Sequence, residues 1–147
     1  MSQTTTARNA CDARLYLDNA SGVLIDISGS TNNVKIGLTN DVGDFKAFSS
    51  QWRGRLTCGK DAKVSLVIIF STAAAEAYQL LKGWWTGGGD RTFQVDIPED
   101  AVGNDRYSGE FILNSLDLPL ASDDAKPIAV TAELLPNGEV TITAIAT

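Results

Sequence analysis

The sequence of 147 residues contains no histidine, the side chain that most often transfers protons near neutral pH. Ser-His-Asp, Cys-His and HExxH mechanisms are therefore excluded. The two cysteines, Cys11 and Cys58, lie far apart in the chain and have no histidine to complete a zinc site. We therefore expect no metal and no cofactor, and we expect both thiols to be reduced in a cytoplasmic protein.

Long apolar runs are also absent. No run approaches the roughly eighteen apolar residues that predict a membrane span, and the polar start of the chain lacks the apolar stretch of a secretory signal. We therefore expect no membrane anchor. Basic residues are scarce as well: 12 Lys and Arg against 18 Asp and Glu give a net charge of −6. A chain with this charge repels phosphate backbones, so DNA would pass it without adhering.

Carboxylate catalysis is the enzymatic alternative that these absences leave, because paired carboxylates can hydrolyse glycosides. The candidate residues are Asp96 with Glu99 and Asp100, and Asp123 with Asp124. The first group lies beside Pro98, and the second lies in 122–126, a stretch with the composition of a solvated turn. We therefore favour a surface role for both groups over catalysis, and we expect the protein not to be an enzyme.

What the sequence does contain is a repeated alternation of apolar and polar residues, which is typical of β-strands. It recurs in 13–18, 22–28, 34–38, 64–70, 91–97 and 128–134. After 64–70 the period changes, and the next apolar residues recur at helical spacing: Ala73, Ala77, Leu80, Leu81 and Trp84. The patterns predict a mainly-β fold, a β-sandwich or partly closed barrel of about eight strands with one flanking α-helix at about 72–85.

Three further features complete the predicted architecture. The apolar set changes parity between Phe111 and Leu118, which predicts a β-bulge near Asn114-Ser115. The sequence Pro136-Asn137-Gly138 separates two alternating runs and predicts a C-terminal hairpin turn. The hydrophilic segment 1–10 predicts an N-terminal arm, and 11–147 then form one domain.

Between 39 and 57 the alternation fades, and we predict a long loop. Connections of this length in a compact domain are usually functional or disordered, and aromatic residues argue against disorder. Phe45, Phe48 and Trp52 would be exposed unless another surface covered them. That surface is either the loop's own domain, as a flap, or another subunit, which we favour.

Most of the chain, from about residue 12 to 146, resembles the major tail tube protein of long-tailed, siphovirus-type bacteriophages. The resemblance rests on the order of two strands, a long loop with glycine and aromatic residues, and then Gly59-Lys60-Asp61-Ala62, which leads into Val64-Ser65-Leu66 and the Ala-rich helix. The earlier stretch from Gly22 to Gly29 is similar to a short strand and polar turn of that family.

The resemblance implies a structural virion protein of the tail, assembled in the host bacterial cytoplasm. Its subunits would form hexameric rings that stack into a tube with an acidic lumen for DNA, and they would meet tail tip, tape-measure and terminator proteins. The long loop and N-terminal arm would reach neighbouring rings, which makes Asp44, Phe45, Phe48, Trp52 and Arg53 contact residues. Asp96, Glu110 and Asp117 are expected to face the lumen because they lie on polar faces of predicted strands.

Two other interpretations stay open. The chain is either a monomeric sandwich module that binds carbohydrate, with Trp52 and Trp85 as stacking platforms, or another ring-forming tail or head component. Self-assembly separates the first from a tail tube, whereas the sequence does not separate related ring-forming proteins.

Overall fold

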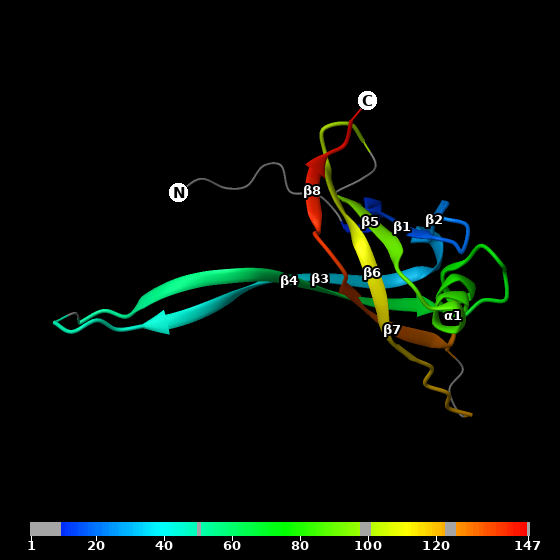
Figure 1. Ribbon diagram of the computed structural model, residues 1–147. Helices are drawn as coiled ribbons and strands as arrows, with labels where there is room; N and C mark the ends of the chain where they lie inside the picture. The colour runs from blue at the N-terminus through cyan, green and yellow to red at the C-terminus, as the bar shows by residue number, and fades with distance from the viewer. Residues whose placement is uncertain (1–9, 50, 98–100, 123–125, 147) are drawn as a thin grey trace, which may run out of the picture.

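The computed structural model describes residues 10–49, 51–97, 101–122 and 126–146, so the predicted N-terminal arm lies outside it apart from residue 10. Within this part of the chain the fold is mainly β, with eight antiparallel strands in one open sheet and a single α-helix (Figure 1). The predicted fold class is therefore confirmed. The elements are β1 (Arg14–Asp18), β2 (Leu24–Asp26), β3 (Thr31–Phe45), β4 (Gly54–Ile69), α1 (Ala77–Gly87), β5 (Arg91–Ile97), β6 (Asp105–Asp117), β7 (Ala129–Pro136) and β8 (Thr141–Ala144).

The strands follow the spatial order β2-β1-β5-β6-β7-β4-β3, and β8 pairs with β6. One face of the sheet carries the alternating apolar residues that the sequence indicated, and α1 packs against that face. The buried set includes Leu15, Leu17, Val64, Leu66, Ile68, Phe93, Val95, Val130, Ala132 and Leu134. Each large aliphatic side chain in this set contributes about 1.5–3 kcal/mol when fully buried, which makes this face the core of the domain.

The helix begins later than the apolar stripe predicted, at Ala77 instead of about residue 72, because its first turn is capped from elsewhere. The backbone N–H of Ala77 donates to Oγ of the buried Ser30, at 3.1 Å. That contact satisfies one of the donors that a helix N-terminus leaves open. The predicted stripe from Ala77 to Trp84 is confirmed as the buried face, whereas Ala73 is exposed and precedes the helix.

A buried arginine joins the helix to the sheet. The Arg91 guanidinium donates to the carbonyl oxygens of Leu80, at 3.0 Å, and Asp18, at 3.4 Å, and it lies 5.8 Å from the centre of the Trp84 ring. Desolvation by burial lowers the pKa of Arg91, and the negative charge of Asp18 opposes this shift. Arg91 therefore holds α1 against β1 and β5.

The predicted C-terminal hairpin is wrong. Both β7 and β8 run antiparallel to β6, with Phe111 opposite Pro136 and Ser108 opposite Thr141. The chain therefore continues in one direction through 137–140, as a bulged interruption between two strands. The predicted bulge in β6 is confirmed by the register shift between Leu113 and Ser115.

The segment predicted as a long loop is instead mostly strand. β3 continues to Phe45 and β4 begins at Gly54, so the connecting turn spans only 46–53. The two strands form a hairpin that projects far from the rest of the sheet, to the left in Figure 1. The hairpin does not fold back over its own domain.

Candidate assembly surface

The projecting part of the hairpin, Gly37 to Lys63, is the feature that sets this molecule apart from a simple domain, and we call it the arm. The body strand β7 pairs with β4 only from Val64 onward, so within the described residues the arm strands pair only with each other. The nine residues from Gly37 to Phe45, at about 3.3 Å each, extend roughly 30 Å. The remainder of the described chain is called the body.

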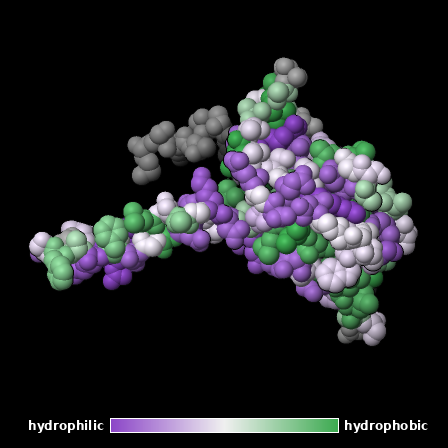
Figure 2. Space-filling model, in the orientation of Figure 1, coloured by the Kyte–Doolittle hydropathy of each residue, from purple (hydrophilic) through white to green (hydrophobic). Residues whose placement is uncertain are grey.

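Between Leu38 and Asp61 both faces of the arm are open to solvent, and apolar and polar residues lie side by side on its visible surface (Figure 2). Its exposed large apolar residues are Leu38, Val42, Phe45, Phe48, Trp52 and Leu56. An isolated two-stranded hairpin is only marginally stable in water, and exposed apolar clusters of this kind mark interaction sites. The arm therefore has the properties of a segment that another surface covers.

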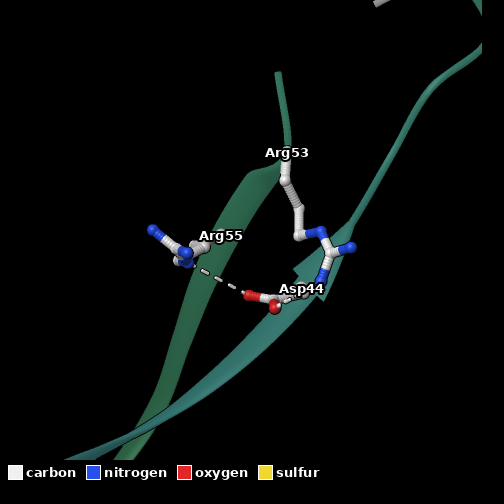
Figure 3. Close-up of polar contacts among 3 residues, drawn as sticks. All are labelled: Asp44, Arg53 and Arg55. Atoms are coloured by element: carbon white, nitrogen blue, oxygen red, sulfur yellow. Dashed lines mark hydrogen bonds and ion pairs between the residues drawn. The ribbon is translucent and has the colours of Figure 1, made fainter. Parts of the chain in front are cut away.

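Near the tip, one carboxylate holds two arginines across the strands (Figure 3). Asp44 accepts from Arg53, at 3.3 Å, and from Arg55, at 3.2 Å. All three side chains are substantially exposed, so these pairs contribute little to stability. Their effect is to hold two guanidinium groups in a fixed place on the surface of the arm.

Aromatic residues surround the tip. The ring of Phe45 lies over Gly54, where a Cβ atom would be 2.4 Å from the ring, so the absence of a side chain at Gly54 allows this contact. Phe48 and Trp52 have relative exposures of 101% and 85%. These values are far above those of the core aromatics, so the two rings are presented outward.

A β-bulge divides the arm. Asn40 pairs with Lys60 and Val42 pairs with Thr57, so Asp41 alone lies opposite Cys58 and Gly59. Gly59 has a φ of +84°, in the region that favours glycine. The extra residue bends the strand and increases its local twist.

Charge is distributed unequally between the arm and the rest of the chain. The arm carries five Lys and Arg against three Asp and Glu, whereas the remaining sequence carries seven against fifteen. The arm thus has a net charge of +2 and the rest of the chain −8. Electrostatic attraction therefore favours contact between the arm of one copy and the body of another.

Of the three acidic residues expected on exposed polar faces, only two lie there. Asp96 is fully buried and accepts from Arg106 at 2.8 and 3.1 Å, so the basis for its expected lumen position was wrong. Glu110 is exposed and accepts from Thr92, and Asp117 is exposed near the end of β6. Asp96 is buried because β5 has both faces covered along most of its length.

The alternative sites find little support in the arrangement of the described residues. Glu99, Asp100, Asp123 and Asp124 lie outside them. Trp52 is at the arm tip and Trp85 is on α1, at opposite ends of the molecule, so they do not form one platform. Within the described residues, no cluster of three or more His, Cys, Asp or Glu is placed to hold a metal, and no helix is long and apolar enough to cross a membrane.

Sequence reasoning missed part of this surface. Arg55, Leu56, Val42 and Leu38 belong to it alongside the predicted Asp44, Phe45, Phe48, Trp52 and Arg53. The positive net charge of 37–63 could have identified this segment from the sequence, because five basic residues lie there in an otherwise acidic chain.

Comparison with known proteins gives a consistent fold. No protein-family model matches the chain, and no curated protein sequence matches it. A subunit from the tail of an empty GTA particle with C6 symmetry is 22% identical and superposes with a TM-score of 0.77, covering 94% of this chain and 100% of that one. The SPP1 tail tube subunit is 10% identical with a TM-score of 0.75, covering 96% and 81%.

A subunit of the sheath-tube complex of an extracellular contractile injection system, PVC, is 10% identical with a TM-score of 0.71 and covers 98% of this chain and 100% of that one. At these identities the likeness shows the fold. The chain has the fold shared by subunits of phage-like tails and injection-system tubes, and the match spans nearly its whole length.

Proposed function

We propose that the chain is the tube subunit of a phage-type tail, a structural and not a catalytic protein of the virion. It assembles as hexameric rings that stack into a tube, in the long-tailed type that the sequence resembles. The observation that carries this proposal is the match over 94% of the chain to a tail subunit from a particle with C6 symmetry. The protruding basic arm supports it, because its exposed apolar residues are typical of a surface that a partner covers.

The charge distribution supports a role as a conduit. With a net charge of −6, the assembled subunits repel a DNA backbone, and the basic excess is confined to the arm. Glu110 and Asp117 are the exposed acidic residues that we assign to the lumen. Within the particle, the tube meets tail tip, tape-measure and terminator proteins, and the subunits assemble in the bacterial cytoplasm.

Electron microscopy of the purified, concentrated protein tests the proposal. We expect rings with sixfold symmetry and tubes built from stacked rings. A variant in which 39–61 are replaced by a two-residue Asn-Gly turn joins the paired residues Leu38 and Ala62, keeps the body and removes nearly all of the arm. We expect it to form no tubes while its far-ultraviolet circular dichroism stays mainly β. Dispersed monomers at every concentration, together with binding to a glycan array, would favour the carbohydrate-binding module instead.

A further inference from the structure

A groove opens where the arm leaves the body. β4 and β7 pair along residues Val64 to Ile69 of β4. On the N-terminal side of Val64 the two strands diverge, because β4 belongs to the arm there, whereas β7 stays paired with β6 and is followed by β8, which also pairs with β6. The space between them is about 330 Å³ in volume. We call it the junction groove; its lining includes Leu38, Lys60, Asp61 and Ala62 from the arm and Glu139, Val140 and Ile142 from the body.

The groove has two properties of an acceptor site. Within the described chain, β8 pairs only with β6, and β4 at Lys60–Lys63 pairs only with β3, so each strand leaves a backbone edge toward the groove. Its walls combine half-exposed apolar side chains, Leu38 and Ile142, with the carboxylates of Asp61 and Glu139, which outnumber the single ammonium group of Lys60. Open edges of this kind bind extended segments.

The arm tip has the complementary chemistry. Its turn presents Phe48 and Trp52, and the same end of the hairpin carries Lys46, Arg53 and Arg55 against one acidic residue, Asp44. An arm cannot reach the groove of its own chain, because its two paired strands place the tip roughly 30 Å beyond that groove. A tip that occupies the groove must therefore come from another molecule.

We propose that the junction groove of one copy receives the arm tip of a second copy. Phe48 and Trp52 cover Leu38 and Ile142, and the basic side chains of the tip face Asp61 and Glu139. This inference rests on the proposed function and names the surface that accepts the arm. Each copy donates one tip and offers one groove, so the contact is heterologous and can propagate from copy to copy.

Cross-linking in assembled protein tests the contact. The background is the full chain with Cys11→Ser and Cys58→Ser, because both native thiols are free and exposed. Phe48→Cys combined with Ile142→Cys and treated with a short bis-maleimide is expected to give a ladder of covalent oligomers that requires both cysteines. The control pair is Phe48→Cys with Thr86→Cys, which places the second thiol on exposed α1.

The outcomes separate this inference from the proposed function. Rings and tubes with no ladder from the groove pair, or with an equal ladder from the control pair, would overturn the groove and leave the tube subunit standing. A ladder without rings would support the groove and contradict the tube. Protein that neither assembles nor cross-links would overturn both.

A second variant tests the apolar part of the groove without disturbing the fold. Ile142→Asn changes an exposed side chain without adding charge, so the body should unfold as before, while the concentration required for assembly rises about tenfold, as loss of about 1.4 kcal/mol of contact energy predicts. Thr143→Asn is the matched control, because it is also exposed and points to the opposite face of β8. Equal effects of the two substitutions would contradict the proposed contact.

Discussion

Two sets of carboxylate-arginine contacts among the described residues, one in the body and one in the arm, differ in their surroundings. Asp96 is fully buried between β1 and β6 and accepts both bonds from one guanidinium, at 2.8 and 3.1 Å. Asp44 lies in solvent and accepts one longer bond from each of two arginines. The body thus satisfies its polar groups internally, whereas the arm holds its charges where a partner can reach them.

The tryptophans differ in the same way. Trp84 is 1% exposed, and its indole N–H donates to the carbonyl oxygen of Gly89 at 2.8 Å. Trp52 is 85% exposed at the tip of a two-stranded hairpin. The body therefore buries its aromatic and polar groups within the chain, whereas the arm exposes groups that we propose are covered on assembly. Four predictions test this division.

The largest effect is expected from truncating the core tryptophan. Trp84→Ala removes a fully buried ring and leaves a cavity beneath Arg91, so the free energy of unfolding should fall by about 3–5 kcal/mol. Trp52→Ala should change it by less than about 0.5 kcal/mol, because the ring is already in solvent. Urea denaturation of dispersed protein measures both.

Assembly should respond differently from stability. Trp52→Ala is expected to raise the concentration at which tubes form about tenfold, as measured by sedimentation. A stable Trp84→Ala variant, or a Trp52→Ala variant that assembles normally, would contradict the division between body and arm.

An intermediate effect is expected from the two carboxylates. Asp96→Asn removes the charge opposite Arg106, and because the Arg106 side chain is partly exposed we expect a loss of about 2 kcal/mol, below the cost for a fully buried pair. Asp44→Asn should cost less than about 0.5 kcal/mol, as for other exposed pairs. Chemical denaturation compares the two, and equal losses would show that the arm contributes to the stability of the isolated chain.

The smallest effect on the body is expected from the bulge glycine. Gly59→Ala forces a side chain into a left-handed conformation, at a cost of about 1 kcal/mol that falls on the arm. We expect unchanged thermal unfolding of the body and about a fivefold rise in the assembly concentration. Gly43→Ala is the control, because it lies in the same hairpin with no atom within 4 Å and no positive φ. A loss of body stability in Gly59→Ala alone would show that the arm is not independent.

The sequence predicted the body well because alternation reflects burial. Leu15, Leu17, Val64, Leu66 and Ile68 fall on one covered face, and the helical stripe ends at Trp84 as expected. The arm strands were not predicted, because both faces of this hairpin lie in solvent and its residues therefore show no alternation of apolar and polar side chains. Candidate contact residues were found there through their aromatic character instead.

The remaining errors have non-local causes. The residue types of Pro136-Asn137-Gly138 are those of a turn. The segment forms a bulge instead, because β7 before it and β8 after it both pair with β6. The sequence pattern predicts Asp96 at the surface, because its partner Arg106 lies on a different strand and is brought beside it only by the pairing of β5 with β6. The start of α1 depends on Ser30, which lies far away in the sequence. None of these partners is visible in a local pattern.

The bulge at Asp41 has a mechanical consequence. Regular pairing of this two-stranded ribbon is interrupted where Asp41 lies opposite Cys58 and Gly59, and the extra residue bends the strand there. If adjacent rings are joined through such ribbons, a curved tube can lengthen the joints on its outer side and shorten those on its inner side while every subunit body keeps its shape. Flexibility of the whole filament would then come from the joints, and the channel would stay open as the filament bends.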